Sequence, residues 1–447
     1  MIKVTHSDGE LLRVLGLVFG VAAVVGGSVG QGILRQPGVV AAAVPDPLLI
    51  LVLWLLGGVI AAINAVPLAE LGSAIPRAGG PYVFVRRAFG KTPGAIAGWA
   101  DYLVNLSAQA FMAVVVAEFL HRLGALAAMP VAVLAPALIA IFYFVNLSHT
   151  KVCGSTQSIG SAIKGLGLLA LVALLFFGGA SDGAAAAERS SQDTAILSVG
   201  ALALAMRAVQ NTYDGWNNCI YFSEEMKDPH KHVPRSLFGG IALVTCIYVL
   251  INAALIYSLG PSGMAASNLP AADALAAAIG DWAGTLLTLF GIISVAAILN
   301  LNVMFGPRIA LAMSRDTLLP RYCSRVSRNG SPVIALTVGT VIAAGLAASG
   351  TYQDLIAFNV ALGFLVNSAV CLAALRLRQT EPALPRPWRM PLHPWPIFVA
   401  VSINAALLAA MIVEDAFHSL AGIFAAILIG VGYRLFHRSE TIEAAAA

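Results

Sequence analysis

Apolar runs of about twenty residues recur along almost the whole chain, separated by short polar stretches. A run of this length crosses a bilayer as one helix. Twelve such runs are expected, at 11–42, 48–75, 94–123, 130–149, 155–180, 194–222, 236–260, 281–314, 332–349, 354–378, 394–414 and 416–437. The polar stretches are too short to bury a core of their own. The pattern therefore predicts an all-α membrane protein with twelve transmembrane helices and no soluble domain.

Two of these runs are interrupted at matching places. The first run breaks at residues 26–34 (GGSVGQGIL), and the sixth breaks at residues 211–218 (NTYDGWNN). Lipid offers no partner to backbone N–H and C=O groups, so an unwound segment at mid-membrane depth needs something else to satisfy it. Corresponding broken spans in two halves of a chain indicate the substrate site of an inverted-repeat transporter. We expect the repeats to cover 1–180 and 194–378, with accessory helices at 394–437 and a tail at 438–447.

Basic residues gather in alternate loops. Their order is Arg77, Arg86, Arg87 and Lys91 after the second run, Lys227, Lys231 and Arg235 after the sixth, Arg321, Arg325 and Arg328 after the eighth, and Arg386 and Arg389 after the tenth. The other loops carry mainly acidic residues. Because loops rich in Lys and Arg stay in the cytoplasm, both termini are expected on the cytoplasmic side of the cell's inner membrane.

Composition agrees with this pattern. The chain is 59% hydrophobic and only 11% charged, whereas soluble chains carry about 25% charged residues. The five cysteines contain no CxxC pair, and His230 and His232 are a weak candidate for a metal site. No nucleophile–base pair or phosphate-binding loop is visible. We therefore expect no enzyme activity, no cofactor and no nucleic-acid partner; the lipid bilayer is the expected surrounding.

The glycines of the first break predict an anion site. Gly30 and Gly32 permit backbone conformations that other residues resist. Unwinding here points the N–H groups and the positive dipole end of the next half-helix into the break, where a substrate carboxylate would bind. The alternative is close helix packing through small residues.

The sixth break suits the ammonium group of a zwitterionic substrate whose carboxylate binds at the first break. Free carbonyls at Asn211 and Thr212 would accept hydrogen bonds from a substrate ammonium. Asp214 is the only acid in this break, and an ionisable residue inside the membrane is a functional candidate. Asp is also a favoured N-cap, so the alternative role for Asp214 is to cap the start of the second half-helix.

Four segments in order are similar to motifs of the amino acid–polyamine–organocation (APC) transporters. They are 30–38 (GQGILRQPG), 70–82 (ELGSAIPRAGGPY), 222–229 (FSEEMKDP) with 233–235 (VPR), and 319–322 (LPRY) with 330–332 (GSP). The resemblance covers nearly the whole chain. It implies a LeuT-type fold of five-plus-five inverted repeats, with helices 1 and 6 broken and alternating access as the mechanism.

Within that superfamily, residues 213–217 (YDGWN) look closest to L-type amino-acid transporters and their bacterial relatives. The resemblance implies substrate-binding residues in both breaks: Gly30, Gln31 and Gly32 for the carboxylate, Val29, Asn211 and Thr212 for the amine, with Tyr213, Asp214 and Trp216 beside them. Gln31 is a departure, since many relatives carry a small residue there; its amide would narrow the pocket or contact the substrate.

Two basic side chains, Lys164 and Arg207, lie within apolar runs. Lys164 in the fifth run is costly unless paired or deprotonated, and the resemblance implies that it takes the place of a sodium ion in coupling. Alternatively it snorkels to the membrane surface. Arg207 lies before the sixth break, where it would line an outer vestibule or pair with Glu118.

The sequence thus predicts a secondary transporter of neutral amino acids that is independent of sodium and uses a proton or a counter-substrate as its coupling species. One alternative is a polyamine or basic amino-acid exchanger of the same superfamily. Another is a transporter-like amino-acid sensor without net transport.

Overall fold

The computed structural model describes residues 11–30, 32–124, 126, 128–147, 150–177, 198–267, 269–280, 282–327, 330–349, 352–414, 416–417 and 420–432. In these residues the secondary structure is helical, apart from one isolated bridge between Leu15 and Met226. The helices are α1 (Leu17–Ser28), α2 (Gly32–Ala43), α3 (Pro47–Ala74), α4 (Pro81–Phe89), α5 (Lys91–Arg122), α6 (Val131–Asn146), α7 (Thr150–Phe177), α9 (Val199–Tyr213), η1 (Asn218–Glu225), α10 (Pro229–Ala266), α11 (Pro270–Ile279), α12 (Ala283–Arg315), η2 (Arg321–Ser324), α13 (Val333–Ser349), α14 (Tyr352–Thr380) and α15 (Trp395–Glu414).

Six of the described helices are long and apolar enough to cross a membrane, namely α3, α5, α7, α10, α12 and α14. The number rises to seven if α1 and α2, which meet at a bend of 49°, form one broken span. Five shorter apolar helices accompany them: Val131–Asn146, Pro270–Ile279, Val333–Ser349, Trp395–Ala410 and Leu420–Gly432. The protein is thus a multi-pass helical membrane protein, and the count of twelve spans stays a prediction.

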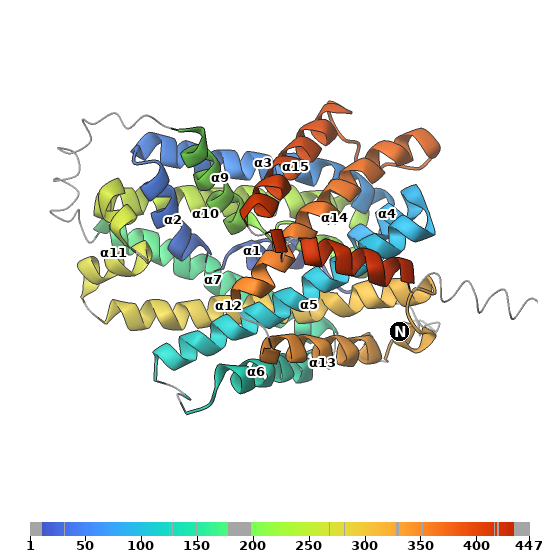
Figure 1. The fold of residues 1–447 in the computed structure, drawn as a ribbon, viewed down its shortest axis with the longest axis horizontal. Helices are drawn as coiled ribbons and strands as arrows, with labels where there is room; N and C mark the ends of the chain where they lie inside the picture. The colour runs from blue at the N-terminus through green and yellow to red at the C-terminus, as the bar shows by residue number, and fades with distance from the viewer. Residues whose placement is uncertain are drawn as a thin grey trace, which may run out of the picture.

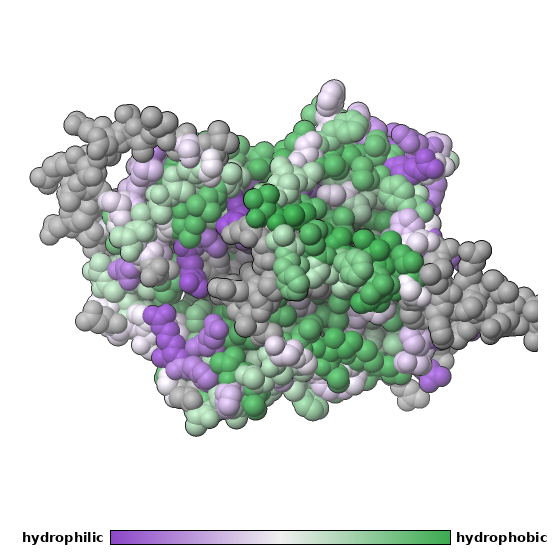
Figure 2. Space-filling view, in the orientation of Figure 1, coloured by the Kyte–Doolittle hydropathy of each residue, from purple (hydrophilic) through white to green (hydrophobic). Residues whose placement is uncertain are grey.

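The long helices lie side by side, with α1 in the middle of the bundle (Figure 1). α1 packs against α10, α7 and α12; α3 packs on α10, and α5 packs on α12 and α14. α6 and α13 form a pair beside α5. Apolar residues cover most of the face in Figure 2, and polar residues gather mainly toward its left and right, which are the ends of the helices. This distribution is typical of a helical bundle whose central part is surrounded by the hydrocarbon core of a membrane.

Helix boundaries differ from the sequence prediction in two informative places. The predicted sixth break starts at Asn211, but α9 continues through Tyr213 and the irregular segment starts at Asp214. Thr212 lies within α9, and its hydroxyl donates back to the Ala208 carbonyl at 2.9 Å. The segment after the break is also a 3-10 helix, η1, rather than an α-helical half.

Two helices lie outside the predicted runs, and turn residues explain both starts. α4 begins at Pro81, directly after Gly80 in a left-handed conformation (φ +55°), and ends at Gly90 (φ +87°). α11 likewise begins with a proline, Pro270. Proline fits the first turn of a helix because its missing N–H would have had no partner there.

Candidate functional site

A cavity of about 710 Å³ lies where the first and sixth predicted spans are broken. Its walls come from the end of α1, the start of α2, the segment between α9 and η1, and the facing sides of α5, α12 and α14. The predicted binding residues that line it are Gly30, Gly32, Asn211, Thr212, Asp214 and Trp216. The structure therefore brings together two segments that are about 180 residues apart in the sequence.

The two breaks touch each other through glycines. A Cβ built on Gly27 would lie 2.8 Å from the Gly215 carbonyl oxygen, and a Cβ on Gly215 would lie 2.6 Å from the Gly27 carbonyl carbon. Gly215 also has a left-handed backbone, with φ +93°. Only glycine has both the freedom and the small size for this contact. Backbone therefore meets backbone at the cavity wall.

Carbonyl groups at the end of α1 have partners from three other helices. Gly26 O accepts from Lys164 Nζ at 2.7 Å, and Val29 O accepts from Ser294 Oγ at 3.3 Å. The Tyr248 hydroxyl lies 2.8 Å from Ser28 O and 2.9 Å from Thr212 O, so one side chain of α10 bridges both broken helices. Each of these carbonyls still has a second lone pair.

The start of α2 presents the opposite polarity. Gly30 and Gly32 line the cavity at this point, and a Cβ on Gly32 would lie 3.2 Å from the Thr212 side chain. The first N–H groups of a helix have no partner within it and carry a partial positive charge. The cavity thus adjoins a helix end suited to an anion. Gln31 lies outside the described residues.

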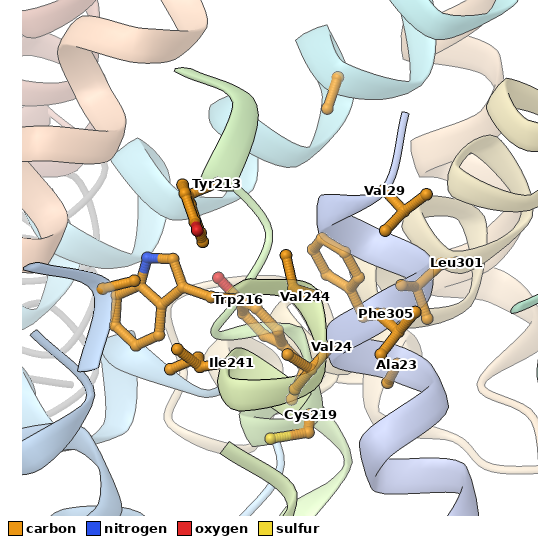
Figure 3. Packing of buried hydrophobic residues seen from close by; sticks show 14 of the residues in the cluster. Ala23, Val24, Val29, Tyr213, Trp216, Cys219, Ile241, Val244, Leu301 and Phe305 are labelled. Atoms are coloured by element: carbon orange, nitrogen blue, oxygen red, sulfur yellow. The ribbon is translucent and has the colours of Figure 1, made fainter. Parts of the chain in front are cut away.

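Val29 and Tyr213 stand apart from the other predicted residues. Val29 is fully buried, and neither residue belongs to the cavity lining among the described residues. The Tyr213 hydroxyl donates to Trp54 O at 2.8 Å, and its ring packs on Trp54 and Tyr248. Figure 3 shows Tyr213 at the end of α9 and Trp216 on the segment that joins α9 to η1, with Val29 across from them beside Leu301.

Asp214 faces the cavity at the end of α9. It occupies the C-cap position of that helix with an extended backbone (ψ 148°), and it is exposed. The N-cap of η1 is Asn217, whose side chain makes no capping hydrogen bond. Asp214 is therefore not the N-cap of the following helix, which was the alternative reading of its sequence position.

Lys164 lies on α7 and is completely buried, and its amine donates to Gly26 O of α1. Ser161, one turn earlier, donates from Oγ to Ala22 O at 2.7 Å. Two hydrogen bonds thus hold α7 to α1 next to the break. The Lys164 amine does not snorkel to the membrane surface.

Arg207 is half-buried on α9 and does not belong to the cavity lining, although Leu204 and Gln210 of the same helix do. Within the described part of the chain, no ion pair joins it to Glu118. Its placement in an outer vestibule stays a prediction.

Sequence reasoning missed a second acid in the cavity. Asp101 of α5 is 3% exposed, lines the cavity, and accepts a hydrogen bond from the Tyr221 hydroxyl at 2.7 Å. An acid inside the apolar run 94–123 was the signal that could have found it. Arg35 of α2 also lines the cavity. Among the described residues, no three His, Cys, Asp or Glu side chains form a metal site.

The chain is similar to known proteins over most of its length. The family model described as amino acid permease matches residues 10–433. The serine/threonine exchanger SteT of Bacillus subtilis is 25% identical over 417 residues, covering 91% of this chain and 93% of the relative. The b(0,+)-type amino acid transporter 1 of Mus musculus is 28% identical over 438 residues (94% and 87%), and the Asc-type amino acid transporter 1 of the same organism is 28% identical over 388 (84% and 72%). These matches confirm the resemblance to APC transporters.

Proposed function

Because the chain belongs to the amino acid permease family, we propose that it is a secondary transporter that moves neutral L-amino acids across the cytoplasmic membrane without sodium. The relatives named above are amino acid transporters by their names, which supports an amino acid as substrate. The proposal further includes alternating access, twelve spans in a LeuT-type arrangement of two inverted repeats at 1–180 and 194–378, and both termini in the cytoplasm.

One observation supports the zwitterionic substrate above all others. The cavity adjoins helix ends of opposite polarity, namely the N-terminus of α2 and the C-termini of α1 and α9. A carboxylate would bind at Gly30, Gln31 and Gly32, where the dipole favours an anion. An ammonium would bind opposite, at the carbonyl end with Asn211 and Thr212 and near the carboxylate of Asp214.

Lys164 is the proposed coupling residue. Its amine is already hydrogen-bonded to α1 beside the break, at the end of the helix where a cation is favoured. In sodium-coupled relatives of this fold a bound sodium ion would hold the first broken helix at this place. In this protein the protonated amine of Lys164 would hold it instead. The coupling species would then be a proton or a counter-substrate.

The alternative of a basic amino-acid or polyamine exchanger is favoured by one specific observation. Two carboxylates, Asp101 and Asp214, line a single cavity, and Arg35 is the only basic residue among its described lining residues. The alternative of a sensor would require binding without translocation, which transport assays separate directly.

Counterflow into liposomes tests the proposed function. Purified protein is reconstituted, and uptake of labelled neutral amino acids, their decarboxylated amines, lysine and a polyamine is measured with sodium or choline as the only monovalent cation. We expect uptake of neutral amino acids that is equal in both salts and absent for the amines. Equal uptake of an amine, or a requirement for sodium, would refute the assignment, and binding without counterflow would favour the sensor.

A further inference from the structure

One oxygen of a buried carboxylate is left without a partner in the cavity. Asp101 receives the Tyr221 hydroxyl on Oδ1, but Oδ2 has no hydrogen-bond partner among the described residues. The residue is 3% exposed and nevertheless lines the cavity. Its free oxygen is thus buried in the protein and next to the space that a substrate would fill.

In the part of the chain that the structure describes, the surroundings of Asp101 offer no partner for that oxygen. The Tyr221 ring stacks on Phe305 with 4.3 Å between centroids, which holds the hydroxyl that orients the carboxylate. The cavity lining on the same helix continues with Val104 and Ala108, which are apolar. A buried carboxylate oxygen without a hydrogen bond is costly. Other buried polar atoms also have no partner among the described residues, such as Asn252 Oδ1 and Gln109 Oε1, but neither of these residues lines the cavity, whereas Asp101 does.

We propose that Asp101 Oδ2 accepts a hydrogen bond from the side chain of the substrate, so that the cavity favours amino acids with a hydroxyl or amino group over apolar ones of the same shape. The proposal rests on the proposed function, since it takes the substrate to be an amino acid. Tyr221 acts as the positioning residue, because its hydroxyl fixes Oδ1 and leaves Oδ2 for the ligand. The two breaks bind the carboxylate and the ammonium group, which all amino acids share. Asp101 distinguishes amino acids by their side chains.

Matched pairs of substrates measure this preference. Threonine and valine have nearly the same shape and differ by one hydroxyl, and lysine and norleucine differ by a terminal amine. A hydrogen bond to a charged acceptor is worth about tenfold or more in binding. We expect the native protein to take up the donor-bearing member of at least one pair about tenfold better at low concentration. The pair that shows the preference identifies the donor as hydroxyl or ammonium.

Asp101→Asn is the main variant. It retains the shape and an oxygen for Tyr221, but it presents an NH₂ group to the cavity in place of the acceptor. We expect the preference to fall toward one while uptake of valine or norleucine persists. Asp46→Asn is the matched control, because Asp46 caps α3 outside the cavity lining and Asn is an equally good N-cap. The control should keep the native ratios.

Tyr221→Phe keeps the test decisive if Asp101→Asn does not fold. It leaves the carboxylate in place without its positioning hydroxyl, so the preference should weaken severalfold while uptake of the apolar substrate is retained. Native ratios near one in both pairs, or ratios unchanged in folded Asp101→Asn, would overturn the proposal. A preference that disappears in Asp214→Asn and survives in Asp101→Asn would overturn it too. Failure of the proposed function looks different, since it would appear as equal uptake of a decarboxylated amine, a requirement for sodium or binding without counterflow, whatever the ratios within the two pairs.

Discussion

At the scale of single residues, the candidate site depends on glycines, whose lack of a side chain matters as much as the side chains of other residues. Gly27 and Gly215 carry no side chain, which lets the two breaks meet backbone to backbone. Gly30 and Gly32 leave the start of α2 open to the cavity. Glycine spacing alone was compatible with simple helix packing. The structure shows that packing and an open helix end coexist here, at different glycines of the same break.

Gly215→Ala should destabilise the protein and abolish substrate binding. The new Cβ would lie 2.6 Å from the Gly27 carbonyl carbon, on a backbone with φ +93°. Left-handed strain alone costs about 1–3 kcal/mol for a residue other than glycine. The midpoint of thermal unfolding in detergent and ligand-induced stabilisation measure both effects.

Gly239→Ala is the control for that variant. A Cβ at Gly239 meets nothing within 4 Å, and alanine is favoured over glycine in the middle of a helix such as α10. Equal unfolding temperatures for the two variants would contradict the role given to the Gly27–Gly215 contact.

At the scale of elements, α7 and α10 hold the broken helices. α7 donates from Ser161 and Lys164 to α1, and α10 places the Tyr248 hydroxyl between α1 and α9. The break in the sixth span begins three residues later than predicted, since α9 continues through Tyr213, and Tyr248 of the neighbouring α10 donates to the carbonyl of Thr212 in its last turn. Hydropathy marks where a helix is weak, and the contacts with neighbouring helices decide where it ends.

Lys164→Ala should impair transport more than substrate binding. Without the amine, the carbonyl of Gly26 loses its bond to α7, and α1 loses one of the hydrogen bonds that restrain it at the break. If Lys164 carries the coupling proton, the variant should also have a flatter dependence of uptake on pH. Sodium is not expected to restore uptake. Binding by scintillation proximity and uptake in liposomes from pH 5 to 9 give the two readouts.

Ser161→Ala separates coupling from simple tethering. It removes the neighbouring bond to α1 but no ionisable group, so it should weaken α1 packing and leave the pH profile of uptake native. A Lys164→Ala variant with a native rate and native pH profile would show that Lys164 is structural.

At the scale of the whole molecule, ion pairs join η1 to the last turns of α12 at one end of the bundle. Arg308 of α12 forms a bidentate pair with Glu225 at 2.8 and 3.0 Å, with both side chains at most 5% exposed. Arg315 pairs with Glu224 at 2.8 Å, and Ala78 N–H donates to the same carboxylate. α1 joins this end through backbone bonds of Leu15 to Glu225 and Lys227. These contacts connect segments from both predicted repeats.

Removing one partner of the buried pair should cost much more than removing both. Glu225→Gln leaves the Arg308 guanidinium buried without its counter-charge, and such a change costs about 3–5 kcal/mol. In the double variant Glu225→Leu/Arg308→Met no charge remains, so most of the unfolding temperature should return. Thermal unfolding in detergent measures both. A double variant less stable than Glu225→Gln would refute this account.

The Glu224 pair gives a pH dependence with a definite sign. Burial raises the pKa of Glu224, but the hydrogen bonds from Arg315 and Ala78 N–H and the nearby charges of Arg315 and Arg77 outweigh burial and lower it below the ordinary 4.5. A lowered folded-state pKa means that the stabilisation is complete above the ordinary value and is lost as pH falls through the lowered one. Glu224→Gln should therefore be less stable than the native protein at pH 7. The difference should shrink below about pH 4; a constant difference would contradict the pairing.

The sequence by itself determined the class of the protein and predicted where its candidate site lies. Long apolar runs with few charges require lipid, and glycine-rich and polar interruptions within them locate the breaks, because both signals are local in the chain. The tertiary structure alone decided the partners. Asp101 and Tyr221 are 120 residues apart, Lys164 and Gly26 are 138 apart, and Tyr248 and Ser28 are 220 apart. Hydrogen bonds of this kind depend on how helices pack, which hydropathy does not encode, so the unpartnered oxygen of Asp101 became visible only when its neighbours were in place.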